Sequence, residues 1–239
     1  MDDLDLDLEP EFVVKVEFPF KELFDPADPL AQWVANLGRA VNDLLLANRR
    51  LKGSFDRETN RGEAIYDIRA VATHAWELTK FLEDTSSTAV DAFRARMLKE
   101  ANQDWERVQG FIRDSTPIVG SKSFKATLIS ARDQGSHYSE IDHKLLRRAM
   151  AHQGEDDADG SPHLGAAFVG ETFKDSYNEF ATELDYQLFC EIKDEDVEPL
   201  KKFIMPLNEM VAALIRFAST AIHTYLADHE DKLQVTHLD

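Results

Sequence analysis

The chain has 239 residues and a mass of 27.2 kDa, and its 45 acidic and 27 basic side chains give a formal charge of −18 at pH 7. This length accommodates one large or two small domains with a sizeable core. The charge repels polyphosphate at long range, which argues against a protein that coats nucleic acid but does not exclude a local basic site.

The compartment is indicated by cysteine usage and by the N-terminus. The single cysteine, Cys190, rules out an intrachain disulfide and fits a reducing compartment. The start, Met1-Asp2-Asp3, lacks the basic residues of a signal peptide. No apolar run approaches the roughly 18 residues that a membrane span requires. We therefore expect a cytoplasmic protein with no membrane partner.

Residues 1–25 are expected to form an acidic tail followed by an extended arm. Val14, Val16 and Phe18 alternate with charged residues, a pattern typical of a short strand or of an arm laid over a helical bundle. Because the sequence shows no second strand that could pair with it, we favour the arm.

Residues 26–239 are predicted to form a single all-α domain, a helical bundle of about six to seven helices. Glycine and proline number only 10 and 8, so long helices are expected. Ser86 or Ser87 can cap the third helix, a break is expected at 114–120 around Pro117, and an irregular acidic loop covers 153–165. Three-and-four spacing of apolar residues predicts helices near 29–51, 65–82, 90–112, 121–133, 145–150, 173–188 and 200–222.

Two segments partly match known metal-binding motifs, but each lacks ligands that its motif requires. The acidic loop that begins at Glu155 has Ala166 where a calcium loop requires a bidentate glutamate. Glu140 and His143 form one Glu-x-x-His pair, whereas carboxylate-bridged iron bundles require two such pairs and two further glutamates. We expect no metal and no cofactor.

A more informative pattern is an arginine followed five positions later by a histidine. In an uninterrupted helix this spacing places the two side chains about 140° apart, so Arg69 and His74 should not converge. Arg147 and His152 are explained by a basic helix end that complements the helix dipole. The pattern occurs at Arg69–His74, Arg132–His137 and Arg147–His152.

The Arg132–His137 pair differs in its context. Arg132 lies beside the apolar stripe of its helix, and Gly135 is expected to weaken or end that helix and let His137 turn back towards Arg132. A half-buried guanidinium requires an anionic partner. That partner is either a carboxylate of a neighbouring helix, such as Glu179 or Glu183, or a phosphate.

The segment Ala131-Arg132-Asp133-Gln134-Gly135-Ser136-His137-Tyr138 resembles the Arg–polar–x3–His signature of the HEPN superfamily, all-helical domains that often act as metal-independent ribonucleases. The resemblance implies a composite site where two chains of a homodimer bring their motifs together. His137 would then transfer protons as general acid or base, and Arg132 would stabilise the charge on the phosphate. Asp133 would orient the pair, and Tyr138 would contact the substrate.

The basic residues around the motif are candidate substrate contacts that could counter the negative field locally. For any single one of them, a solvated helix face is the simpler interpretation. They are Lys122, Lys125, Lys144, Arg147 and Arg148.

Three functional hypotheses follow. The first is an endoribonuclease or RNA-binding protein that works as a homodimer without a cofactor. The second is a non-catalytic interaction module, in which Arg132 forms a structural ion pair and the acidic surface binds a basic protein partner. The third, a small-molecule-binding bundle, requires a large apolar pocket. Catalysis requires Arg132 and His137 in a solvent-reachable cleft, whereas the module predicts that a carboxylate of the same chain closes off Arg132.

Overall fold

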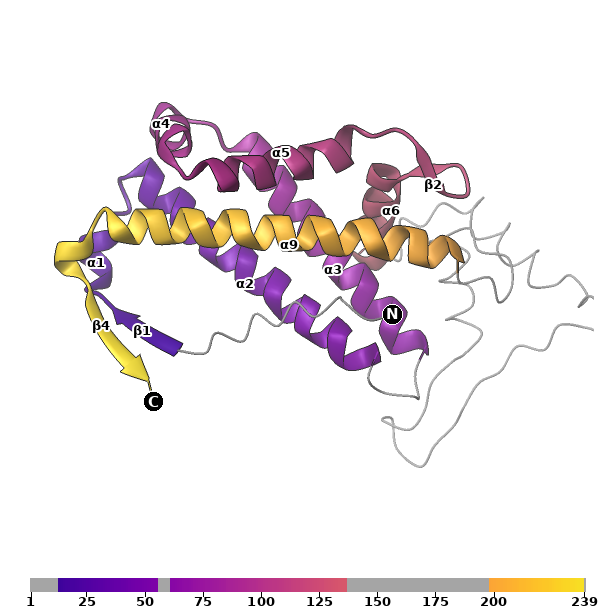
Figure 1. Cartoon of the computed structure of the whole chain (residues 1–239), viewed down its shortest axis with the longest axis horizontal. Helices are drawn as coiled ribbons and strands as arrows, with labels where there is room; N and C mark the ends of the chain where they lie inside the picture. Colours follow the sequence, from indigo (N-terminus) through magenta and orange to yellow (C-terminus); the bar gives the residue numbers. More distant parts are fainter. Residues whose placement is uncertain (1–12, 56–60, 137–197, 239) are drawn as a thin grey trace, which may run out of the picture.

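The computed structural model describes residues 13–55, 61–136 and 198–238, and within these ranges the chain is an all-α bundle with two short two-stranded sheets (Figure 1). The predicted fold class is confirmed. The helices α2 (Pro29–Phe55) and α3 (Arg61–Asp84) pack against each other, and the long helix α9 (Glu198–Ala227) packs across both.

The predicted helix starts are confirmed at two N-termini. Pro29 is the first residue of α2, where its missing N–H costs nothing, and the Asp28 carboxylate accepts a hydrogen bond from the Leu30 N–H at 2.9 Å. Ser87 caps α4 (Thr88–Arg96), and its Oγ accepts a hydrogen bond from the Val90 N–H at 3.2 Å.

The single helix predicted over 90–112 is wrong. Two helices, α4 and α5 (Lys99–Arg113), replace it, with Met97 in an extended conformation and Leu98 in a non-helical one between them. The break lets α4 pack against α2 while α5 packs against α9. No glycine or proline lies at this position, and the three-and-four spacing of apolar residues continues across it. The sequence pattern therefore predicted one helix.

A small hairpin occupies the end of the break predicted at 114–120 and continues to Ser123, so the helix predicted from 121 begins at Phe124 instead. Its strands are β2 (Pro117–Val119) and β3 (Lys122–Ser123), which pair antiparallel. Gly120, in the turn between them, has a φ of 53°, a backbone conformation that glycine adopts without steric cost. The hairpin leads directly into α6 (Phe124–Ser136), which packs against α3 and α5.

The N-terminal arm is extended, as expected, but it does have a partner strand. β1 (Val13–Glu17) pairs antiparallel with β4 (Gln234–Leu238), at the other end of the chain. The prediction that no second strand exists was wrong because β4 is short and partly polar. Between these strands and the bundle lie a short helix, α1 (Phe20–Leu23), and a 3-10 turn, η1 (Glu230–Lys232).

Side-chain hydrogen bonds join the two chain ends beside this sheet. The buried Tyr225 hydroxyl donates to the Leu23 carbonyl, and Lys232 Nζ donates to the Glu22 carbonyl at 3.0 Å. The start and the end of the described chain are therefore held together by side chains as well as by strand pairing.

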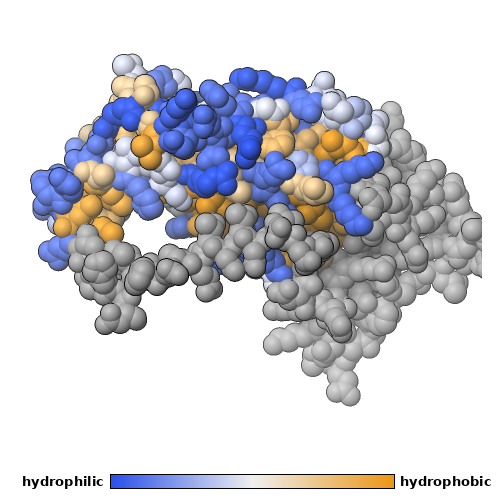
Figure 2. All heavy atoms as spheres, in the orientation of Figure 1, coloured by the Kyte–Doolittle hydropathy of each residue, from blue (hydrophilic) through white to orange (hydrophobic). Residues whose placement is uncertain are grey.

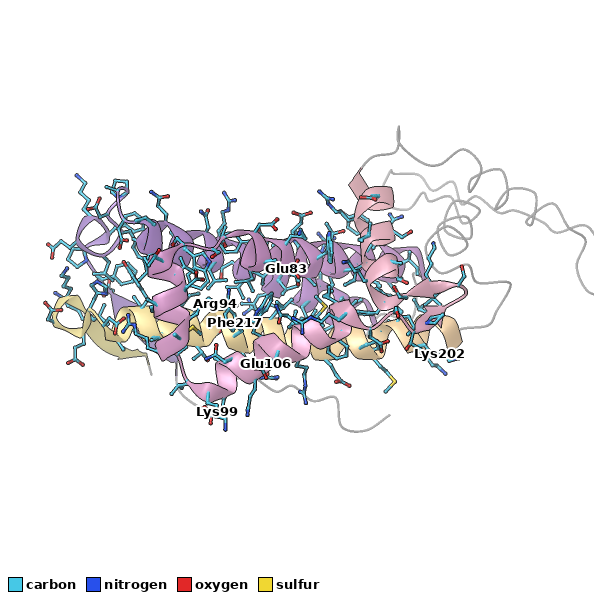
Figure 3. All side chains as sticks on the ribbon, turned by 90° about the horizontal axis from the view of Figure 1, so that it is seen from above. Glu83, Arg94, Lys99, Glu106, Lys202 and Phe217 are labelled. Carbon is cyan, nitrogen blue, oxygen red and sulfur yellow. The ribbon has the colours of Figure 1, made fainter. Side chains whose placement is uncertain are left out.

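A half-buried arginine, Arg94, lies between aromatic rings of the bundle. The guanidinium of Arg94 is 5.3 Å from the ring centroid of Trp105 and 5.5 Å from that of Phe217, and it donates to the Leu82 carbonyl at 3.3 Å (Figure 3). Burial lowers the pKa of Arg94 below its ordinary value, although an arginine stays charged. These contacts bring α3, α4, α5 and α9 together around one cation.

The segment Leu200–Ala227 of α9 is long and apolar enough, by length and composition, to cross a membrane. The expectation that no such run exists was therefore wrong. Half of its most apolar window, 50%, is buried inside the bundle. The absence of a membrane partner stays a prediction.

On the face shown in Figure 2, hydrophilic side chains gather over α4 and α5, and hydrophobic ones emerge in patches between helices.

Candidate functional site

Arg132 lies on α6 at the edge where this helix packs against α3. The neighbouring residues Leu128 and Ala131 are fully buried, which holds α6 in register on α3. Arg132 is beside this apolar stripe, as expected, but its side chain remains 46% exposed. The candidate arginine is therefore held at the surface.

The anionic partner of Arg132 belongs to the same chain. Arg132 Nε lies 2.6 Å from Glu77 Oε1 on α3, and the Glu77 side chain is 51% exposed. A second carboxylate, Asp133, is at the edge of ion-pair range, with its Oδ1 3.9 Å from Arg132 Nη1. One guanidinium is thus flanked by two carboxylates, and the pair is open to solvent.

Glu77, the ion-pair partner of Arg132, was not among the partners that the sequence analysis named. The expected partners, Glu179 and Glu183, lie outside the described residues. Nothing in the local sequence signals the Arg132–Glu77 pair, because it depends on which helix α6 packs against.

The helix α6 runs through Gly135 to Ser136. Gly135 therefore lies within α6 and does not terminate it. A glycine inside a helix lowers helix stability by about 1 kcal/mol relative to alanine. Several candidates for the same site lie outside the described residues, as does the loop at 153–165. These candidates are His137, Tyr138, Lys144, Arg147 and Arg148.

The two candidate lysines of this region are both engaged. Lys125 Nζ lies 5.8 Å from the ring centroid of Trp76, a cation–π distance, and Trp76 directly precedes Glu77 on α3. Lys122 Nζ donates to Ser130 Oγ at 3.4 Å. At the α3–α6 edge, Lys125 therefore contacts α3 beside the Arg132–Glu77 pair.

The pair Arg69–His74 lies in the uninterrupted helix α3, as expected. Arg69 is buried, while His74 lines a hollow between α2 and α3 to which Arg69 does not contribute. The two side chains therefore lie in different environments and do not form a common site.

This α2–α3 hollow has a volume of about 140 Å³ and is the second site that the sequence analysis missed. Asp43, Leu46 and Arg50 on α2 line it together with residues of α3 that include Tyr66 and Asp67. Its residues come from two helices, so no single motif contains them. It is too small to be the large apolar pocket that the small-molecule hypothesis requires.

Within residues 13–55, 61–136 and 198–238, no three histidine, cysteine, aspartate or glutamate side chains are grouped so that they could hold a metal ion. Comparisons of the chain with protein-family models, with curated proteins and with solved structures find no match. The functional argument therefore depends on the geometry described above.

Proposed function

We propose that this chain is a non-catalytic helical interaction module whose acidic surface binds a basic protein partner. The observation that supports this proposal most directly is the 2.6 Å ion pair between Arg132 and Glu77. The arginine that a ribonuclease would direct at a phosphate is already paired with a carboxylate of its own chain.

The local charges support the same proposal. Glu77 and Asp133 flank Arg132, so a phosphate that approaches this guanidinium also approaches two negative charges. Like charges placed together at an interface suppress the wrong partner. The formal charge of −18 adds a field that repels RNA and speeds the approach of basic surfaces.

A second candidate is the HEPN-like, metal-independent endoribonuclease that acts as a homodimer. It is favoured by the 46% exposure of Arg132 and by the position of Lys125, about two turns earlier on the same side of α6. In this hypothesis an RNA phosphate displaces Glu77 from Arg132, and His137 transfers the proton.

RNA cleavage in EDTA, measured together with light scattering, tests both candidates. The variants are His137→Ala and Arg132→Ala. The matched control is Arg107→Ala, which removes an exposed arginine of α5 that pairs with no carboxylate in the described part of the chain. A labelled poly-lysine chain tests for a cationic partner at several salt concentrations.

The interaction module predicts that all four proteins leave RNA intact and that poly-lysine binds saturably, with an affinity that falls as salt rises. The proposal is overturned if the wild type is a dimer that cuts RNA in EDTA and the two motif variants lose this activity while Arg107→Ala keeps it. Failure of the wild type to bind poly-lysine at low salt also overturns it.

A further inference from the structure

The α2–α3 hollow already holds a guanidinium. Arg50 Nε lies 3.5 Å from Asp67 Oδ1, and the Arg50 guanidinium is 5.7 Å from the ring centroid of Tyr66. The Asp67 side chain is only 6% exposed, whereas that of Arg50 is 60% exposed. A buried carboxylate beside an aromatic face is a setting that favours a guanidinium or an ammonium group.

Two of the residues that line the hollow are exposed apolar side chains. Leu46 is 61% exposed and Tyr66 is 51% exposed, although most large apolar side chains of the described bundle are buried. Both line the same hollow, so they form one surface feature. An exposed aromatic residue and an aliphatic residue next to a charge have the composition of a protein-binding hot spot.

The charges that line the hollow favour a cationic occupant. Asp43 and Asp67 contribute two carboxylates, while Arg50 contributes one positive charge. Asp43 is exposed and makes no ion pair with any residue that the structure describes. A phosphate at this place would meet the Asp43 carboxylate, whereas an arginine or lysine would complement it.

The size of the hollow fits one side chain. Its volume is about 140 Å³, and a cavity of about 150 Å³ is large enough for benzene.

We propose that the α2–α3 hollow is the docking point for a basic segment of a partner protein, with an arginine or lysine between Asp43 and the Tyr66 ring and a neighbouring apolar residue on Leu46. This inference rests on the proposed function, because it locates the basic partner on the surface. The contacts of Arg50 with Asp67 and with the Tyr66 ring show that these two side chains can bind a guanidinium.

Fluorescence anisotropy with the full chain tests the site. The probe is a labelled peptide of alternating arginine and leucine, and its control contains citrulline in place of arginine, which keeps the shape but removes the charge. Asp43→Asn and Tyr66→Ala alter exposed side chains, and circular dichroism checks that both variants fold. Glu106→Gln on α5 is the charge-matched control for Asp43→Asn, and Leu98→Ala, which truncates an exposed leucine, is the control for Tyr66→Ala.

We expect Asp43→Asn to weaken binding of the arginine peptide about five-fold and Tyr66→Ala about ten-fold, while the two controls stay within about two-fold of the wild type. We expect the citrulline peptide to bind at least about ten-fold more weakly than the arginine peptide.

The docking proposal is wrong if the peptide binds but Asp43→Asn and Tyr66→Ala behave like their controls. The interaction-module function would then survive with its site elsewhere. If the wild type does not bind the arginine peptide at all, both proposals fail. If a labelled single-stranded RNA binds and Tyr66→Ala abolishes that binding, the hollow belongs to nucleic acid and the protein-docking assignment is overturned.

Discussion

The Arg96 guanidinium on α4 and the Asp228 carboxylate just beyond α9 face each other through two hydrogen bonds, one of them 2.8 Å from Nη1 to Oδ1. Such a two-point contact fixes the orientation of both side chains. The guanidinium also lies 5.0 Å from the ring centroid of Phe93. The pair therefore connects the middle of the chain to its C-terminal end.

The hydrogen bond from Arg96 lowers the pKa of Asp228 below its ordinary value. A carboxyl group whose pKa is lower in the folded state stabilises the fold above its unfolded pKa, which is about 4 for aspartate, and loses this contribution as the pH falls through its folded pKa. We expect Asp228→Asn to reduce the free energy of unfolding by about 0.2–1 kcal/mol near neutral pH, the range for exposed pairs. Urea unfolding should show that the difference stays constant down to about pH 4 and shrinks below it.

The charge-matched control for this prediction is Glu106→Gln, which should show no such loss. A difference between wild type and Asp228→Asn that grows as the solution becomes more acidic would contradict the assigned role of Arg96.

The Arg132–Glu77 ion pair can be measured directly. A double-mutant cycle with Glu77→Gln and Arg132→Gln should give a coupling free energy of about 0.2–1 kcal/mol, because both side chains are half-exposed and water screens the pair. Urea unfolding at low and high salt supplies the four values, and the coupling should decrease at high salt. A coupling of zero at low salt would contradict a stabilising role for the pair.

The buried apolar face of each helix could be predicted from sequence, because the three-and-four spacing of apolar residues within one helix is enough to identify it. Trp33, Leu37 and Leu44 on α2 are all buried, as their spacing predicts. The break at Met97 and Leu98 could not be predicted, since it depends on which helices α4 and α5 contact.

For the candidate site too, features within one helix could be predicted from sequence, whereas contacts between helices could not. The position of Arg132 beside an apolar stripe follows from its own helix, and the structure confirms it. Its partner Glu77 and the Arg50–Asp67 pair each join residues of two helices, so they follow only from the packing of those helices.

Arg94 tests how much a cation between aromatic rings stabilises the bundle. We expect Arg94→Met to lower the free energy of unfolding by about 1–2 kcal/mol, because methionine keeps much of the packing but loses the cation–π contacts and the hydrogen bond to the Leu82 carbonyl. Urea unfolding measures the loss. Arg107→Met on the exposed side of α5 is the matched control and should change stability by less than about 0.5 kcal/mol. Equal effects of the two substitutions would show that the rings do not stabilise the cation.

Two helical glycines offer stabilising substitutions. A Cβ at Gly38 on α2 would meet Ile222 Cδ1 at 3.9 Å, an ordinary contact, and a Cβ at Gly110 on α5 would meet nothing within 4 Å. Because glycine loses more backbone entropy than alanine on folding, Gly38→Ala and Gly110→Ala should each raise the free energy of unfolding by about 0.5–1 kcal/mol. Gly120→Ala should instead lower it by about 1–2 kcal/mol, since a φ of 53° strains a residue with a Cβ. Urea unfolding of the three variants checks these signs, and a loss of stability in Gly38→Ala would show that α9 lies closer to α2 than the Ile222 contact indicates.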